Sequence, residues 1–173
     1  MKTLCSILPL IVSVSTLAAA EPIPNSLIDY QRFQKIVVKS AKPREAARLT
    51  EKQFLAAMAE KDTVLLDARS TDKYALRHIK EAVNLPFTDF TEETLKKVLP
   101  SKTTKILIYC NNNFRGDQAA FASKSAPASL NLSTQISLRA YGYTNIYELG
   151  PLLEVGKTAI PFDGSQIYEE ARP

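Results

Sequence analysis

Apolar residues along this chain gather into short runs that are separated by longer amphipathic segments. The runs at 63–67 and 105–110 have strand length and lie between charged or turn-forming residues, as expected of central strands covered on both faces. Shorter extended pieces are predicted at 47–49 and 82–85, and a last strand at 145–148. Strands alternating with helices indicate an α/β fold with a mostly parallel central sheet flanked by helices on both faces.

Apolar positions between these runs recur at spacings of three and four residues, which predicts helices. The first helix covers 27–42 and ends near Pro43. A second has a clear start, because Thr50 caps it and Gln53 completes a capping box, and it runs to about Glu60. Further helices are expected at 70–79, 91–99, 116–125 and 133–140, the last of them closed by Gly142.

Residues 1–20 have the pattern of a secretory signal peptide. Lys2 gives a positive start, an apolar stretch follows, and Ala18, Ala19 and Ala20 offer small residues for cleavage before Glu21. We therefore expect an exported protein, which would be periplasmic if the source is a Gram-negative bacterium. The alternative is a retained membrane anchor, but a spanning helix needs about 20 predominantly apolar residues and this run is shorter and contains Pro9.

The charge of the chain excludes some classes of partner. The formal charge of +4 falls by one when Lys2 leaves with the signal, and the basic residues are spread along the chain, so we expect no nucleic acid partner. The basic residues Lys39, Lys42 and Arg44 are interrupted by Glu45, and we interpret them as a solvated helix face. No later apolar run approaches spanning length, so we expect no membrane association after cleavage.

Cys110 is the one thiol that remains when Cys5 leaves with the signal. An internal disulfide is then excluded, and a lone thiol is either buried and inert or retained because it reacts. The position of Cys110 favours reaction, because it follows an apolar strand and ligands of open α/β sheets bind at the carboxyl ends of the strands.

The residues after Cys110 are suited to holding an anion. A thiol reacts as its thiolate, and successive backbone N–H groups, a helix start at Gly116 and the Arg115 guanidinium would all stabilise negative charge on the sulfur. Asn is enriched among non-glycine residues with positive φ, which a tight amide cradle requires. The candidate binding residues are Asn111, Asn112, Asn113, Phe114, Arg115 and Gly116. The alternative is a plain Asn-rich turn after a buried strand with an inert cysteine.

Several motifs, in order, resemble those of rhodanese-like domains. Asp67-Ala68-Arg69 follows a strand, and His78-Ile79 with Ala82-Val83-Asn84-Leu85-Pro86 comes next. The run ending in Cys110, with Arg115 beyond it, resembles the active-site loop, and 141–149 resembles the stretch that follows it. The resemblance implies a rhodanese-like domain at 46–155, with a helical extension at 21–45 and a polar tail at 156–173.

In that family the loop cysteine accepts a sulfane sulfur from a donor such as thiosulfate and passes it to cyanide or a thiol. The resemblance therefore implies that Cys110 is the nucleophile, that Arg115 holds the anion and that the amides of 111–116 cradle the persulfide. It implies structural roles for Asp67 and Arg69, and we also interpret the single histidine, His78, as structural. No cofactor is expected, and no metal, because one histidine and one distant cysteine supply too few ligands.

Two other functions stay open on this fold. Related phosphatases have a loop one residue longer, and the six-residue loop from Cys110 to Arg115 favours sulfur over phosphate. The family often has Gly where Asn113 stands, and about a dozen residues are inserted after Arg115. The chain could therefore be a catalytically silent module that binds a protein partner through 117–132 and the amphipathic helix at 27–42.

Overall fold

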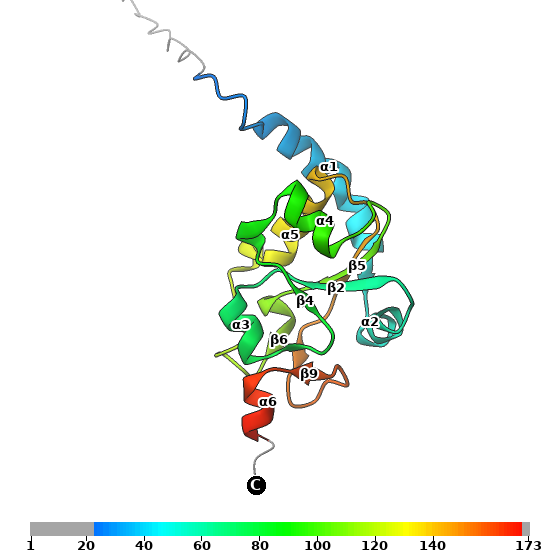
Figure 1. Ribbon diagram of the computed structural model, residues 1–173, viewed down its shortest axis with the longest axis vertical. Coiled ribbons are helices and arrows are strands. Elements are labelled where there is room, and N and C mark those ends of the chain that lie inside the picture. The colour runs from blue at the N-terminus through cyan, green and yellow to red at the C-terminus, as the bar shows by residue number, and fades with distance from the viewer. Residues whose placement is uncertain (1–22, 171–173) are drawn as a thin grey trace, which may run out of the picture.

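The two apolar runs form the centre of a parallel sheet (Figure 1). The computed structural model describes residues 23–170, so the expected signal at 1–20 lies outside the described residues. Five parallel strands stand in the order β1-β7-β5-β2-β4. Their bounds are Arg48–Leu49 (β1), Ile146–Leu149 (β7), Lys105–Tyr109 (β5), Thr63–Asp67 (β2) and Val83–Asn84 (β4). The predicted α/β fold with a parallel sheet is confirmed.

Helices cover both faces of this sheet and bury two separate apolar clusters. Successive side chains of β5 point to opposite faces, as the pleat of a strand requires. Ile106 and Ile108 pack with α4 (Glu92–Val98) and α5 (Leu130–Ala140), whereas Leu107 and Tyr109 pack on the opposite face, which α2 (Glu51–Met58) and α3 (Thr71–Leu76) cover. Cys110 continues this alternation and so falls on the α5 face, which positions the thiol.

Capping residues in the local sequence set the starts of α2 and α4. The Thr50 side chain accepts a hydrogen bond from Gln53 N–H, and the Gln53 side chain accepts one from Thr50 N–H. This pair of bonds is the predicted capping box. Thr91 forms the same arrangement with Thr94, and α4 ends two residues before Pro100. Such caps satisfy backbone N–H groups that have no partner within the helix.

The first helix, α1 (Tyr30–Ala46), departs from its predicted end. It continues through Pro43 for another turn and packs against α5, so the prediction that it ends near Pro43 was wrong. Proline removes one hydrogen bond from a helix, but tertiary contacts can outweigh that loss. Here they do, because Arg44 in the added turn forms an ion pair with Glu148 of β7.

The segment at 116–125, predicted to be helical, is an irregular loop. Its side chains are committed to tertiary contacts that a regular helix would not allow: Ala120 and Phe121 are fully buried in the core, and Asp117 pairs with Arg77 at 2.9 Å. The following helix, α5, starts at Leu130, three residues earlier than predicted. A short 3₁₀ turn, η3 (Ala126–Ala128), precedes it, and similar turns form η1 (Phe87–Asp89) and η2 (Asn111–Asn113).

The C-terminal residues pack on the domain, although their sequence is polar. β9 (Phe162–Asp163) pairs antiparallel with β3 (His78–Ile79), and α6 (Ser165–Glu170) follows it. Gly164 links them with φ +122°, where an added Cβ would meet the Leu76 carbonyl oxygen at 2.5 Å. A third, two-stranded sheet is formed by β6 (Phe114–Arg115) and β8 (Leu153–Glu154), which run parallel.

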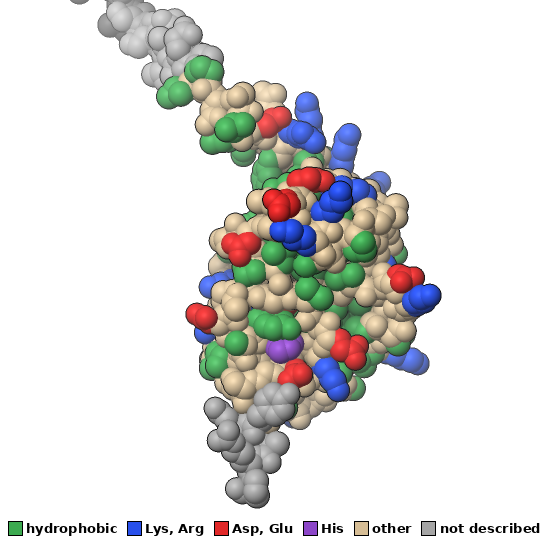
Figure 2. Space-filling view, viewed as in Figure 1, with side chains coloured by type: hydrophobic (Ala, Val, Ile, Leu, Met, Phe, Trp, Pro, Cys, Tyr) green, Lys and Arg blue, Asp and Glu red, His purple; other side chains and the backbone are tan. Residues whose placement is uncertain are grey.

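The first turns of α1 project beyond the body of the domain (Figure 1). Apolar side chains lie uncovered on α1, such as Tyr30 and Val38, and on the residues just before it, Leu27 and Ile28 (Figure 2). Within residues 23–170, none of the helices is both long and apolar enough to span a membrane.

Candidate active site

Cys110 lies at the carboxyl end of the central strand β5, on the face that α5 covers. Its side chain is 1% exposed, and its Sγ atom lies 3.4 Å from Ser129 Oγ. Ser129 is the N-cap residue of α5, so the helix whose positive end lies beside the thiol is α5. The expectation of a helix N-terminus near the sulfur is therefore met, but by a helix that starts 14 residues later in the chain than Gly116.

A cavity of about 290 Å³ adjoins the thiol. Its wall is mostly polar and is built by the loop after β5, the end of β7, the start of α5 and the last turn of α1. The residues that carry its chemistry are Cys110, Asn112, Asn113, Ser129, Asn131, Arg44, Arg48 and Glu148. Because Cys110 is almost completely covered, a reacting sulfur must approach it through this cavity.

Two arginines and one glutamate form the charged wall of the cavity. Glu148 pairs in register with Ile108 of β5, which puts its carboxylate on the same face as Cys110. Arg44 Nη2 lies 2.5 Å from Glu148 Oε1, and Arg48 Nε lies 3.1 Å from the same oxygen. Burial raises the pKa of the Glu148 carboxyl above its ordinary value, although both arginines act to lower it.

Asn113 is the hub of the loop after Cys110. Its Oδ1 accepts from Cys110 N–H at 2.9 Å and from Asn131 Nδ2 at 3.1 Å. Its Nδ2 donates to the carbonyls of Leu149 at 2.7 Å and Pro151 at 3.2 Å. These bonds lock the end of β5 to the end of β7 and to the start of α5.

The other two asparagines hold the inserted segment. Asn111 Nδ2 donates to the Ala122 carbonyl, and Asn112 exchanges two hydrogen bonds with Lys124. None of the three asparagines has positive φ; among the described non-glycine residues that conformation belongs to Asp62 and Glu81. The expectation that left-handed asparagines shape an amide cradle was therefore wrong, and their side chains act as ties between segments.

Phe114, Arg115 and Gly116 turn away from Cys110. Because 114–115 is a strand, its two side chains point to opposite sides: Phe114 is fully buried in the core, whereas Arg115 is exposed and pairs with Glu154 at 2.7 Å. Gly116 follows beside Glu154. None of the three lines the cavity, so the structure does not place Arg115 where it was expected to hold an anion.

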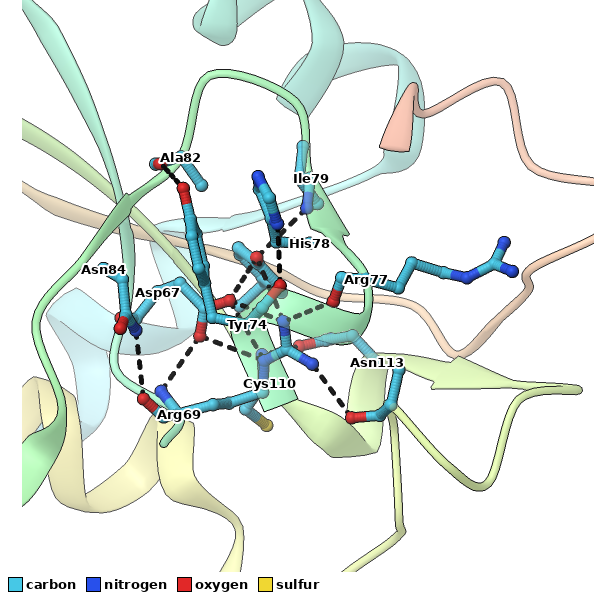
Figure 3. Close-up of polar contacts among 12 residues, drawn as sticks. Asp67, Arg69, Tyr74, Arg77, His78, Ile79, Ala82, Asn84, Cys110 and Asn113 are labelled. Carbon is cyan, nitrogen blue, oxygen red and sulfur yellow. Dashed lines mark hydrogen bonds and ion pairs between the residues drawn. The ribbon is translucent and has the colours of Figure 1, made fainter. Parts of the chain in front are cut away.

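Asp67 and Arg69 form a buried network on the opposite face of the sheet (Figure 3). Arg69 binds both Asp67 carboxylate oxygens and donates to the carbonyls of Ala120 and Arg77. Tyr109 OH donates to Asp67 Oδ2 at 2.5 Å and accepts from Ile79 N–H. Burial, followed by the Asp67 charge, raises the pKa of Tyr109 well above 10. The pair thus fastens β2 and β5 to the inserted segment.

His78 has contacts of a structural kind. Its ring stacks on Tyr74 with centroids 3.7 Å apart, and its Nδ1 lies 2.7 Å from the Tyr74 carbonyl oxygen. It is not among the residues that line the Cys110 cavity. Over the described part of the chain, no group of three or more side chains is arranged to ligate a metal.

Sequence reasoning missed three charged residues of the cavity wall, Arg44, Arg48 and Glu148. One signal was present: Glu148 stands in an otherwise apolar strand, and an acidic residue is rarely fully buried unless it is paired. The sequence could not identify the partners, because Arg44 lies 104 residues earlier in the chain.

Comparisons with known proteins agree on the domain type. A family model described as rhodanese-like domain matches residues 50–150. The tRNA uridine(34) hydroxylase of Onion yellows phytoplasma is 31% identical over 117 residues, 65% of this chain and 33% of that protein. The counterpart from Aster yellows witches'-broom phytoplasma is 30% identical over the same length. This chain therefore spans about a third of the curated relatives it matches.

Solved structures show the same fold at lower identity. A rhodanese-like domain from Anabaena sp. superposes with a TM-score of 0.51 at 19% identity, covering 73% of this chain and 83% of that one. A Bacillus halodurans protein gives a TM-score of 0.50 at 15% identity, covering 77% of this chain and 88% of that one.

Proposed function

The chain belongs to the family of rhodanese-like domains, and from this premise we propose that it is a sulfurtransferase that carries sulfane sulfur as a persulfide on Cys110. The observation that carries the proposal is the placement of the thiol. Cys110 directly follows the central strand of the sheet and lines a polar cavity whose wall contains two guanidinium groups. That combination suits a nucleophile whose substrates and intermediates are anions.

The transfer divides into two displacements on one sulfur atom. The Cys110 thiolate attacks the outer sulfur of a donor such as thiosulfate; a new S–S bond forms, the bond within thiosulfate breaks, and sulfite leaves with the electron pair. An acceptor thiolate or cyanide then attacks the outer sulfur of the persulfide, and Cys110 leaves as the thiolate. Covalent capture thus replaces one difficult transfer by two easier ones.

The surroundings of Cys110 support its anionic states. The Ser129 hydroxyl can donate to the sulfur across 3.4 Å, and the positive end of α5 begins at the same residue. Arg44 and Arg48 bring positive charge to the cavity, which attracts an anionic donor. Arg115, paired with Glu154 at the surface, has no part in this mechanism.

The proposal is tested by turnover. The protein is incubated with thiosulfate and cyanide, and thiocyanate is measured against the Cys110→Ser variant; a parallel assay replaces cyanide by a thiol and measures sulfite. We expect formation of product that depends on Cys110 with at least one acceptor. Equal rates for the native protein and Cys110→Ser would refute sulfur transfer.

A catalytically silent, partner-binding module is the second candidate, and the apolar side chains exposed on α1 favour it. The inserted segment does not, because Phe121 is buried in the core. A silent module needs no reactive thiol, so it predicts that iodoacetamide labels Cys110 no faster than a free cysteine at neutral pH. Labelling several-fold faster than free cysteine would count against this candidate.

A phosphatase gains no support from the loop after Cys110, because from Phe114 on the loop leaves the cavity as the strand β6. Release of phosphate from an aryl phosphate, dependent on Cys110, would revive that function.

Export is part of our proposal and rests on the pattern of residues 1–20. It predicts that the protein secreted by its native host begins near Glu21, which the intact mass measures.

A further inference from the structure

Both arginines in the charged wall of the Cys110 cavity come from outside the part of the chain that the family model matches. That match begins at residue 50, whereas Arg44 belongs to the last turn of α1 and Arg48 to β1. Both arginines line the cavity together with Cys110. Arg44 of the N-terminal extension and Arg48 of β1 therefore complete the site chemically, and α1 also packs against α5.

The cluster carries more positive than negative charge. Arg44 and Arg48 share the single buried carboxylate of Glu148. Glu45 also approaches Arg48, but at 3.4 Å and with 70% of its side chain exposed, so solvent screens its charge. One unit of positive charge in the wall is thus left for a ligand to balance.

Arg44 is the arginine that is better placed to take a ligand. Its Nε and Nη2 bind Glu148, whereas Arg48 also donates Nη2 to the Gly150 carbonyl and Nη1 to Glu45. A guanidinium has five N–H donors in a fixed fork that matches a carboxylate. Arg44 lines the cavity and its side chain is 27% exposed, so its guanidinium is not fully covered.

The size of the cavity points to an organic ligand. About 290 Å³ is room for roughly ten water molecules at about 30 Å³ each. Cyanide would leave most of this space unfilled, and it has no group that could accept two parallel hydrogen bonds from a guanidinium. A small thiol with a carboxylate fills more of the cavity and balances the charge of the wall.

We propose that Arg44, supported by Arg48, binds the carboxylate of the sulfur acceptor, which is a small organic thiol acid. This inference rests on the proposed function. The acceptor thiolate attacks the outer sulfur of the Cys110 persulfide; a new S–S bond forms on the acceptor, the bond to Cys110 breaks, and the Cys110 thiolate takes the electron pair. The proton that the acceptor thiol lost returns to Cys110 or to solvent.

The anion site is tested first without any sulfur transfer. Iodoacetate and iodoacetamide alkylate the same thiol, with loss of iodide, and differ in having a carboxylate or a neutral amide. The rate ratio of the two reagents at Cys110 therefore reports a carboxylate site beside the sulfur. Differences in intrinsic reactivity cancel when this ratio is compared between variants.

Three variants give the expected pattern. Arg44→Gln lowers the iodoacetate to iodoacetamide ratio by about tenfold, the size of a charge-assisted hydrogen bond. Glu148→Gln raises it, because the competing carboxylate is removed. Arg32→Gln, on an exposed position of the same helix, leaves it unchanged. An unchanged ratio in both Arg44→Gln and Glu148→Gln, with thermal unfolding confirming that each is folded, overturns the anion site.

The acceptor is tested on protein already loaded with sulfur. Loss of the persulfide is timed with 3-mercaptopropionate and with 2-mercaptoethanol, and Arg44→Gln is expected to lower the ratio of these rates by about tenfold. If the alkylation ratio responds to Arg44 but the acceptor ratio does not, the assignment of the acceptor is overturned. A native protein that never loads sulfur refutes the proposed function instead, and the alkylation ratios still decide whether the anion site exists.

Discussion

Replacing Asn113 by Ala is expected to destabilise the protein severely, because one side chain holds three segments together. The substitution removes two bonds that Oδ1 accepts, from Cys110 N–H and Asn131 Nδ2, and two that Nδ2 donates, to Leu149 and Pro151. Each hydrogen bond contributes about 0.5–1.5 kcal/mol net, and a buried partner left unpaired costs about 1–3 kcal/mol. The longest contact, to Pro151, counts least, so we expect a loss of about 3–5 kcal/mol.

Urea unfolding followed by circular dichroism measures this loss directly. The midpoint should fall while the slope stays constant, because the surface exposed on unfolding barely changes. Asn145→Ala is the matched control, since Asn145 makes one exposed bond to the Thr103 carbonyl at 3.2 Å. It should cost about 1 kcal/mol or less.

Asn113→Gly distinguishes our account from an amide cradle. Many rhodanese-like loops have glycine at this position, so a loop that served only as a cradle would tolerate the change. We expect instead a loss at least as large as that of Asn113→Ala, because glycine also adds backbone entropy to the unfolded chain. If both Asn113 variants lose a free energy of unfolding within about 0.5 kcal/mol of the Asn145→Ala value, Asn113 does not hold these segments together.

Three further predictions concern the rest of the fold. Arg115→Gln should change sulfur loading less than twofold and stability by at most about 1 kcal/mol, because its pair with Glu154 is exposed. Phe121→Ala should cost about 3–5 kcal/mol in urea unfolding, since the inserted segment buries that ring in the core. Tyr109→Phe should alter the alkaline pH dependence: the pKa of Tyr109 is raised in the fold, so its contribution is complete below pH 10 and declines as the pH rises. The native protein should therefore lose about 1.4 kcal/mol per pH unit relative to Tyr109→Phe above pH 10.

Each of these has an outcome that contradicts it. A loss of loading above tenfold in Arg115→Gln would restore the anion-holding role that the family resemblance implied. A cost below about 1 kcal/mol for Phe121→Ala would mean that the inserted segment opens freely. A constant stability difference between pH 8 and pH 11 would show that Tyr109 titrates normally.

The sheet could be predicted from the sequence because its signals are local. The run at 63–67 and the run ending at Cys110 are apolar over strand length, and the Thr50 capping box marks the start of α2 within four residues. The pairing of Asp67 with Arg69 could also be predicted, because both residues belong to a motif that resembles the one in rhodanese-like domains. These features depend on neighbouring residues and on short spacings.

The charged wall of the cavity and the inserted segment could not be predicted in the same way. Arg44 looked like part of a solvated face, since nothing near it reveals a partner on β7. The segment at 116–125 has helical spacing, but Phe121 and Asp117 find their partners in distant strands and loops, and these contacts override local propensity. The position of Arg115 as the last residue of the six-residue loop suggested an anion site, whereas the pairing of β6 with β8 turns it outward.

One measurement of intact mass shows whether Cys110 holds transferable sulfur. The native protein and Cys110→Ser are each incubated with thiosulfate, desalted and measured intact. We predict that the native protein gains the mass of one sulfur atom, that a reducing thiol removes it, and that Cys110→Ser gains nothing. A native protein without the added sulfur, or a gain that persists in Cys110→Ser, would contradict the account.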